Sequence, residues 1–331
     1  MRNLTLLALC LALCLLRASY GQQRLVVFGD SLSDIGNSFV ASDRTLPPGD
    51  PTAPLGDPHR GYYGVTFDGT GAIFLGRFTD GRNWVDYFQG IAKGFGVNIS
   101  PVTAWLLDPT NSNDNATDFA VGGSTSRDLS VKNGTLPGFP TQVDAYVGRL
   151  VGRSKNAADD LCVIWCGAND FFAGIKPSET VANIKSAIAQ LSQAGAKHIV
   201  VITVPEFGLT PQEKALPGAP VAATQFVVTT NVLLAIELPR IAFANQIRID
   251  LVDINAIFGP VVFQPARFGF KNSSGFAYNP LNGSLLVNDN PNNYVFWDGF
   301  HPTTNVHRLA AAFIFKNIFL SGQIRPFLSF R

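Results

Sequence analysis

The stretch that decides the fold is residues 25–34, Leu-Val-Val-Phe-Gly-Asp-Ser-Leu-Ser-Asp. Its first four residues form a continuous apolar run, which is typical of a strand that is buried on both faces of a parallel sheet. Gly29 and Asp30 then predict a turn, which puts Ser31 at the carboxyl end of that strand. A serine there can cap a helix, or it can face a ligand, because open α/β sheets bind their ligands at that edge.

Further elements follow along the chain. Apolar runs predict buried strands at residues 161–165, 198–204 and 249–252, and helical patterns cover residues 178–195, 222–244 and 303–319. Ser178 is expected to cap the first of these helices, and Pro239 is expected to kink or divide the second. Strands that alternate with helices predict βαβ units around a mainly parallel sheet. Asn169, just after the second strand run, is then expected at the same edge as Ser31.

The composition excludes several classes of protein. Lys and Arg number 25 against 24 Asp and Glu, so no basic excess supports binding to nucleic acid. Hydrophobic residues make up 46% of the 331 residues, which is ample for a large core and excludes a disordered chain. Gly and Pro show no period, so collagen-like and low-complexity classes are excluded as well.

The N-terminal residues are expected to be a secretory signal. Arg2 gives a positive start, residues 4–16 form a short apolar run, and small residues follow at Ala18, Ser19 and Gly21. That run is too short to span a bilayer comfortably, and no later stretch is long and apolar enough to span. We therefore expect a signal peptide over residues 1–21 and a secreted, extracellular protein.

The sequons and the cysteines add expectations about the mature, secreted protein. Five Asn-x-Ser/Thr sequons beyond the signal indicate an N-glycosylated protein, with candidate sites at Asn98, Asn115, Asn133, Asn272 and Asn282. Cys162 and Cys166 also lie beyond the signal, and on a strand their Cα atoms would be about 13 Å apart. A disulfide needs about 7 Å or less, so two free thiols on one buried face are expected.

Four segments carry candidate catalytic groups, at residues 28–34, 119–124, 167–170 and 297–302. Each has an ordinary structural interpretation when taken alone. Ser31 and Asn169 can be capping residues, the glycines of the second segment can belong to a turn, and Asp298 with His301 can form a surface turn. The other histidines have no comparable partner nearby in the sequence, and we interpret them as structural: His59, His198 and His307.

Together the four segments supply the parts that acyl transfer needs. The Ser31 hydroxyl becomes a nucleophile when a base takes its proton, and His301 can be that base. Asp298, three residues earlier, can fix the tautomer of the imidazole. An oxyanion needs preorganised donors, which the N–H groups of Ser31 and Gly123 and the side-chain amide of Asn169 can provide.

These segments resemble the motifs of the SGNH hydrolases, also called the GDSL esterase/lipase family. Residues 29–37 are similar to the first block of that family, 167–170 to the third and 298–303 to the last, and 76–84 resembles a Gly-Arg-Phe-x-x-Gly-Arg element of many members. The resemblance implies a three-layer α/β/α sandwich, the flavodoxin-like SGNH hydrolase fold, with about five parallel strands. It implies a single catalytic domain over residues 22–331 that needs no metal and no cofactor.

The resemblance also implies roles for particular residues. They are Ser31 as nucleophile, His301 as general base, Asp298 as its orienting partner, and an oxyanion hole of Ser31, Gly123 and Asn169. Members often have Asn where this chain has Asp118. Counting from that position favours Gly123 over Gly122 as the donor.

Within that family the chain most resembles the fungal acetylesterases of carbohydrate esterase family 16. That likeness implies removal of acetyl groups from plant cell-wall oligosaccharides, such as acetylated xylo-oligosaccharides. Phe171 and Phe172 can close a short acyl pocket or belong to the core. Aromatic residues that can stack on sugar rings, or lie in the core, are Tyr62, Tyr63, Trp84 and Trp105.

Two other functions remain open at this point. The alternative enzyme is a lipolytic esterase, lipase or phospholipase that acts on longer acyl chains, although no basic amphipathic helix indicates docking on a lipid surface. A non-catalytic sugar-binding protein on the same fold is the third hypothesis. The expected partners are an acetylated oligosaccharide or another small ester, together with N-glycans, and neither nucleic acid nor a membrane span is expected.

Overall fold

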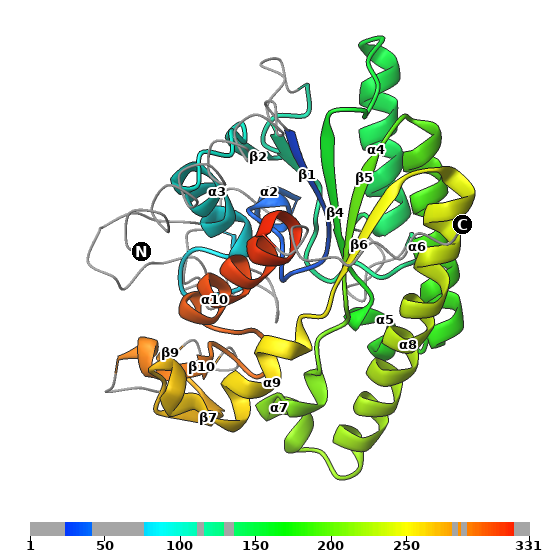
Figure 1. Ribbon diagram of the computed structural model, residues 1–331. Helices are drawn as coiled ribbons and strands as arrows, with labels where there is room; N and C mark the ends of the chain where they lie inside the picture. Colours follow the sequence, from blue (N-terminus) through cyan, green and yellow to red (C-terminus); the bar gives the residue numbers. More distant parts are fainter. Residues whose placement is uncertain are drawn as a thin grey trace, which may run out of the picture.

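A parallel sheet forms the centre of the structure (Figure 1). The structure is a computed structural model, and it describes residues 24–41, 76–110, 116–128, 136–279, 284–285 and 290–320. The six strands of this sheet are β2 (Val102–Ala104), β3 (Ala116–Asp118), β1 (Arg24–Gly29), β4 (Asp160–Trp165), β5 (His198–Ile202) and β6 (Arg248–Val252), in that spatial order. Every neighbouring pair is parallel. Apart from the edge strand β2, this order is the flavodoxin-like one, in which the first strand of the chain lies between the second and the third.

Helices cover both faces of this sheet. Leu25 and Val27 of β1 pack with α3 and α10, whereas Val26 and Phe28 pack with α4, α6 and α8. This alternation follows from the two-residue period of a strand, and burial of both faces explains the continuous apolar runs. The predicted three-layer α/β/α fold is confirmed. The helices are α2 (Asn37–Ala41), α3 (Trp84–Gly94), α4 (Phe139–Gly152), α5 (Ala168–Phe172), α6 (Pro177–Gln193), α7 (Pro211–Lys214), α8 (Ala219–Asn245), α9 (Asn255–Phe263) and α10 (Thr304–Phe315).

Two details of the helices differ from the sequence-based expectations. Helix α6 begins at Pro177 with Lys176 as its N-cap, so Ser178 is not the cap. A proline at the first helical position loses no hydrogen bond and has a suitable φ, which accounts for the earlier start. Helix α8 continues through Pro239 and is not divided there.

The expectation that no stretch after the signal is long and apolar enough to span a membrane is wrong: helix α8 passes that test, judged by length and composition alone. Within the fold, one side of it packs against the sheet through Leu234, Leu238 and Ile241. An apolar inner side of this kind is typical of a helix that covers an α/β sheet.

The carboxyl ends of the strands lie at one edge of the sheet. Helices α5, α7 and α9 come after β4, β5 and β6, and all three lie at this end (Figure 1). Beside it lie the small pairs β7 (Asn272–Phe276) with β10 (Tyr294–Phe296) and β8 (Tyr278–Asn279) with β9 (Ser284–Leu285). Residues 30–34 leave β1 at the same edge, and residues 297–303, which follow β10, lead into α10.

The remaining predicted positions can be compared with the described residues. Cys162 and Cys166 are both buried and carry free thiols, as expected. Asn98 is exposed and Asn272 is half-buried. The other sequons, Asn115, Asn133 and Asn282, lie outside the described residues. The predicted signal peptide, His59, Tyr62 and Tyr63 lie outside them as well.

Candidate active site

Ser31, His301 and Asp298 lie in a line at the carboxyl edge of the sheet. The Ser31 Oγ is 2.9 Å from the Nε2 of His301, and the Nδ1 of the same ring is 2.8 Å from the Oδ2 of Asp298. Asp298 and His301 come from one turn, whereas Ser31 is 270 residues away along the chain. The arrangement lets the imidazole accept the hydroxyl proton while the carboxylate accepts the N–H on its other side.

The Asp298 carboxylate is held as an anion although it is buried. Burial raises the pKa of Asp298, but the His301 charge and the hydrogen bonds that the carboxylate accepts outweigh this, so the pKa lies below its ordinary value. Two of these bonds come from the backbone N–H groups of Phe300 and His301, at 2.8 and 2.7 Å. The turn therefore fixes both the charge of the carboxylate and its orientation toward the ring.

Three residues with N–H donors line the cavity that contains the Ser31 hydroxyl. The N–H groups of Ser31 and Gly123 make no hydrogen bond with the described residues, and Gly123 takes a φ of +82°. The Asn169 amide donates to the Ser124 carbonyl at 3.0 Å, which orients the side chain and leaves its second N–H available. All three residues line the same cavity as His301.

The neighbouring Gly122 is committed elsewhere. Its N–H donates to the Oδ2 of Asp34 at 2.8 Å and to the Oγ of Ser38 at 2.7 Å. A Cβ at Gly122 would meet the Phe78 ring at 2.3 Å, so only glycine fits at this position. Gly122 thus fixes the backbone that presents the N–H of Gly123.

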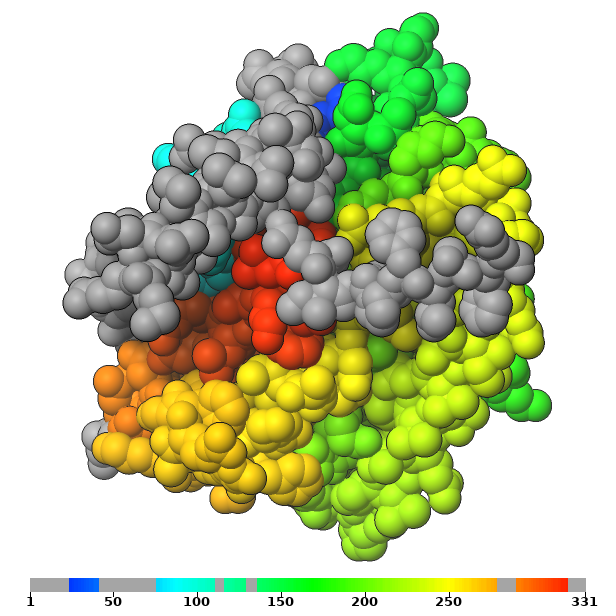
Figure 2. Space-filling view, in the orientation of Figure 1, coloured from blue at the N-terminus to red at the C-terminus, as the bar shows by residue number. Residues whose placement is uncertain are grey.

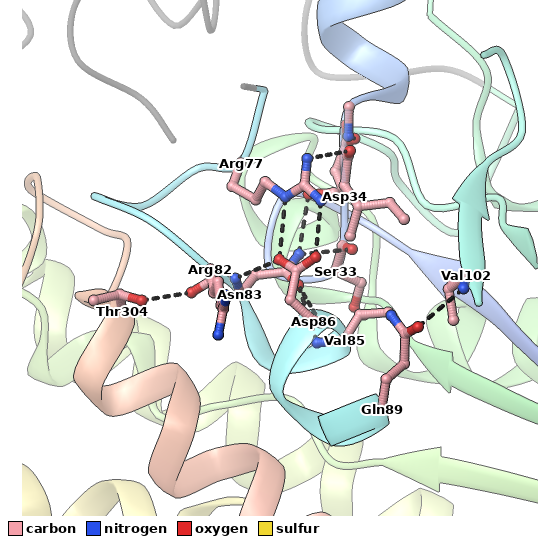
Figure 3. Close-up of polar contacts among 12 residues, drawn as sticks. Ser33, Asp34, Arg77, Arg82, Asn83, Val85, Asp86, Gln89, Val102 and Thr304 are labelled. Carbon is pink, nitrogen blue, oxygen red and sulfur yellow. Dashed lines mark hydrogen bonds and ion pairs between the residues drawn. The ribbon is translucent and has the colours of Figure 1, made fainter. Parts of the chain in front are cut away.

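Side chains of residues 76–84 form hydrogen bonds with the backbone of the loop that carries Ser31 (Figure 3). The Asn83 amide donates to the carbonyls of Ser33 and Asp34, at 2.9 and 3.0 Å. Arg77 donates to the Ile35 carbonyl at 2.7 Å and pairs with Asp86 at the start of α3. These bonds fix the backbone that follows Ser31.

The same segment also holds the loop that carries His301. The Thr79 hydroxyl donates to the Pro302 carbonyl at 2.9 Å, and the Asp80 carboxylate accepts the N–H of Thr304 at 2.7 Å. The Thr304 hydroxyl in turn donates to the Arg82 carbonyl at 2.8 Å (Figure 3). Residues 76–84 therefore bridge the two loops that bear the serine and the histidine. The sequence marked this segment only through a family resemblance.

A cavity of about 480 Å³ extends from the Ser31 hydroxyl. This volume is typical of a pocket that encloses a small organic ligand. Helices α9 and α10, which lie side by side (Figure 2), form part of its wall. The side chains that these two helices contribute are mostly apolar: Ile257, Phe258, Val261, Val306, His307, Leu309 and Ala310.

The predicted aromatic candidates divide between this cavity and the core. Phe172 lines the cavity and is 45% exposed, whereas Phe171 packs against Phe207 and Phe226. Trp84 is fully buried, which rules it out as an exposed sugar platform, and Trp105 is half-buried against Phe119.

Neither of the other two described histidines, His198 and His307, makes a hydrogen bond to Ser31. His198 pairs with Asp250 across β5 and β6 at 2.8 Å. His307, which we interpreted as structural, lines the cavity. Among the described residues, no group of three or more His, Cys, Asp or Glu side chains could hold a metal ion.

The sequence is similar to those of known proteins. The family model of GDSL-like lipases and acylhydrolases matches residues 25–314. GDSL esterase/lipase 6 of Arabidopsis thaliana is 26% identical, over 97% of this chain and 93% of that protein. Acetylajmalan esterase 2 of Rauvolfia serpentina is 27% identical, over 88% and 89%. Thermolabile hemolysin of Vibrio parahaemolyticus is 26% identical over 87% of this chain, which spans 62% of the hemolysin. Because the family model covers most of its length, the chain belongs to the GDSL-like lipase/acylhydrolase family and is a carboxylic ester hydrolase.

Proposed function

We propose that this esterase works through Ser31 as nucleophile, His301 as general base and Asp298 as the group that orients the imidazole. The observation that carries the proposal is the chain of contacts from hydroxyl to imidazole to carboxylate, with distances of 2.9 and 2.8 Å. Both contacts are at hydrogen-bond distance, so a proton can pass from Ser31 to His301 without rearrangement.

The reaction proceeds through an acyl-enzyme. His301 takes the Ser31 proton as the Oγ attacks the ester carbonyl, and the resulting oxyanion accepts bonds from the N–H groups of Ser31 and Gly123 and from the Asn169 amide. The bond to the alcohol then breaks, and the protonated His301 gives the alcohol its proton. Water, deprotonated by the same imidazole, attacks the acyl group on Ser31. The bond between the acyl group and Oγ breaks, the acid leaves, and His301 returns its proton to the Ser31 Oγ.

The acyl group enters the cavity that α9 and α10 help to line. Its apolar walls and its volume of about 480 Å³ support a medium or long acyl chain, because burial of each CH₂ contributes about 0.8 kcal/mol. An acetyl group would leave most of this space without contacts. The size of the cavity therefore favours a lipolytic esterase over an acetylesterase, whose acyl pocket would be closed directly behind Ser31.

Removal of acetyl groups from plant cell-wall oligosaccharides, such as acetylated xylo-oligosaccharides, is the second candidate. It rests on the motif resemblance to the fungal acetylesterases of carbohydrate esterase family 16, and on the 27% identity with a protein named acetylajmalan esterase 2. In this case the large cavity would hold the alcohol part of the ester. Membership of an esterase family argues against the third hypothesis, a non-catalytic sugar-binding protein.

A chain-length series decides between the two candidates. We expect kcat/KM for p-nitrophenyl esters to rise from acetate through butyrate to octanoate, and Ser31→Ala to abolish hydrolysis of every ester. A maximum at acetate, with acetate release from acetylated xylo-oligosaccharides, would reverse the order of the candidates. Full hydrolysis by Ser31→Ala would reject the serine mechanism itself.

The cellular location belongs to the same proposal. The positive start, the short apolar run and the small residues of positions 1–21 support a cleaved signal peptide and a secreted protein. The exposed Asn98 supports N-glycosylation at that sequon. Mass spectrometry of the exported protein tests both, since it reports the mature N-terminus and the glycan masses.

A further inference from the structure

A buried glutamine on α4 bonds to two of the loops that form the site. Gln142 is fully buried, and its side-chain oxygen accepts the N–H of Gly29 at 2.9 Å. Its Nε2 donates to the carbonyl of the same Gly29 at 2.9 Å and to the Oγ of Ser124 at 2.9 Å. A side-chain amide has one acceptor oxygen and two N–H donors, so it can make these bonds at once. Gln142 thus joins the end of β1 to the loop after β3.

The bonds of Gln142 close a ring around the turn that contains Gly123. This turn runs from Val121 to Ser124, whose N–H donates to the Val121 carbonyl at 3.1 Å. The N–H of Val121 donates in turn to the Gly29 carbonyl at 3.1 Å. At the other end of the turn, Ser124 accepts from Gln142, which also bonds to Gly29. Both ends of the turn are therefore fixed to the last residue of β1.

Each of the three oxyanion donors adjoins this ring. Ser31 comes two residues after Gly29, and Gly123 lies inside the turn with a φ of +82°. The Asn169 amide donates to the Ser124 carbonyl at 3.0 Å. An oxyanion hole is effective when its donors already point at the place where charge develops. The ring therefore sets the separation on which these donors depend.

The start of α4 holds Gln142 against the same loop. The Ser124 hydroxyl donates to the Pro137 carbonyl at 2.7 Å, just before the helix. The N–H of Phe139, the first residue of α4, donates to the Thr125 carbonyl at 3.0 Å. Because Gln142 follows Phe139 by less than one turn of the helix, these bonds keep its side chain beside Ser124.

We propose that Gln142 is a positioning residue for ester hydrolysis, which holds the N–H groups of Ser31 and Gly123 at the separation that the oxyanion needs. This inference rests on the proposed function, because it takes those donors as the oxyanion hole. Gln142 lies outside the set of residues that line the cavity. Its loss should therefore weaken the transition state and leave binding of the ester almost unchanged.

The substitution Gln142→Met tests this role. Methionine has a similar length and none of the amide's hydrogen-bonding groups. For p-nitrophenyl acetate, kcat should fall about tenfold to hundredfold, because one oxyanion donor contributes about 10²–10³ and the donors would be displaced rather than removed. KM should change by less than about twofold. A wild-type kcat, or a fall in kcat/KM that comes entirely from KM, would overturn the proposal.

Asn231→Leu is the matched control. The Asn231 amide accepts the N–H of Val204 and donates to its carbonyl, both at 2.9 Å, which is the same pair of bonds that Gln142 makes with Gly29. Val204 lies just beyond β5, whereas the proposed oxyanion donors come from other loops. Asn231→Leu should therefore lower stability but keep kcat for p-nitrophenyl acetate near the wild-type value. An equal loss of kcat in both variants would mean general damage to the fold and would overturn the positioning role.

A double-mutant cycle tests the bond between Gln142 and Ser124. Ser124→Ala removes this bond but keeps those between Gln142 and Gly29, so kcat should fall several-fold. In the Gln142→Met chain the same substitution should lower kcat by a clearly smaller factor, because the bond is already absent. Equal factors in the two backgrounds would show that the glutamine does not act through Ser124, and would contradict the proposal.

The failure of this role can be distinguished from a failure of the proposed mechanism. Hydrolysis by Ser31→Ala would reject the serine mechanism. Crystal structures of the wild-type and Gln142→Met chains test the role without turnover, and the turn from Val121 to Ser124 should be displaced relative to Gly29 in the variant. An unchanged turn would overturn the positioning role, whichever residue proves to be the nucleophile.

Discussion

The Oδ2 of Asp34 accepts the N–H of Gly122 at 2.8 Å, which ties the loop after β1 to the loop after β3. The same carboxylate accepts four more bonds, from the N–H groups of Gly36, Asn37 and Ser38 and from the Ser38 hydroxyl. A buried carboxylate with five donors is a rigid support. It fixes the distance between Ser31 on one loop and Gly123 on the other.

Asp34→Asn should therefore lower both kcat and stability. An amide puts an NH₂ group where donors already point, so the free energy of unfolding should fall by about 3 kcal/mol. The displacement of Gly123 should cost roughly tenfold or more in kcat, since one oxyanion donor contributes about 10²–10³. Urea unfolding and steady-state kinetics measure the two effects. Asp128→Asn, at an exposed carboxylate, is the control, and wild-type kcat in Asp34→Asn would contradict the support that we assign to this residue.

Asn83 caps α3 and also holds the backbone of the loop that follows Ser31, and two substitutions separate these roles. Its Oδ1 caps α3, whereas its Nδ2 holds the carbonyls of Ser33 and Asp34. Asn83→Asp keeps the cap but loses the Nδ2 donors, so kcat should fall several-fold with little change in KM. Asn83→Ala loses both and should cost a further ~1 kcal/mol in the free energy of unfolding.

The control for Asn83 is Asn156→Asp. Asn156 also accepts a backbone N–H, but in an exposed turn before β4. The Asn156→Asp substitution should leave kcat and KM at wild-type values. If Asn83→Asp does the same, residues 76–84 do not position the Ser31 loop.

Filling the cavity should shorten the preferred acyl chain. Val261 is fully buried on α9 and lines the cavity, so Val261→Phe adds a ring where the acyl chain would lie. The ratio of kcat/KM for p-nitrophenyl octanoate to that for the acetate should fall about tenfold or more, while overpacking costs roughly 1–3 kcal/mol of stability. Val151→Phe, on the exposed side of α4, is the matched control. A ratio that is unchanged in Val261→Phe would show that the acyl group does not use this cavity.

Asp118 gives the stability a pH dependence. Burial, and then the nearby charge of Asp34, raise the pKa of Asp118 well above its ordinary value of 3.8. Between 3.8 and that raised pKa the folded chain holds a proton that the unfolded chain has lost, so stability falls as the pH rises, by about 1.4 kcal/mol per pH unit. Asp118→Asn removes this contribution, because an amide is neutral at every pH.

Urea unfolding of the Asp118→Asn chain over a pH series measures the effect. Its stability relative to the wild type should increase as the pH is raised from below 3.8 toward neutrality. The matched control is Asp159→Asn, which changes an exposed carboxylate just before β4 and leaves Asp118 in place. A pH-independent difference for Asp118→Asn would contradict the raised pKa.

The sequence predicted the central strands because both faces of the sheet are buried. The runs at residues 25–28 and 161–165 are apolar along their length, the run at 249–252 is apolar except for Asp250, and each corresponds to a strand of the sheet. Strands β2 and β3 were not predicted. Each has three residues, Val-Thr-Ala and Ala-Thr-Asp, which is too short and too polar for a periodic signal.

The candidate site was predictable only in part. Because parallel strands end at one edge, the positions of Ser31 and Asn169 after two strands implied that they lie close together, and both line the cavity. The walls of α9 and α10 could not be predicted, since they come from distant segments whose packing no local pattern records. His307 was interpreted as structural for the same reason, because its contact with the cavity depends on how α10 packs.

Covalent labelling of Ser31 tests the central claim most directly. A fluorophosphonate reacts with a serine whose hydroxyl is activated by a neighbouring imidazole, and mass spectrometry of the digested protein identifies the labelled residue. We predict one adduct, on Ser31, that forms in step with the loss of esterase activity and is strongly slowed by His301→Ala. Labelling of a different residue, or full esterase activity in a chain labelled at Ser31, would contradict the account.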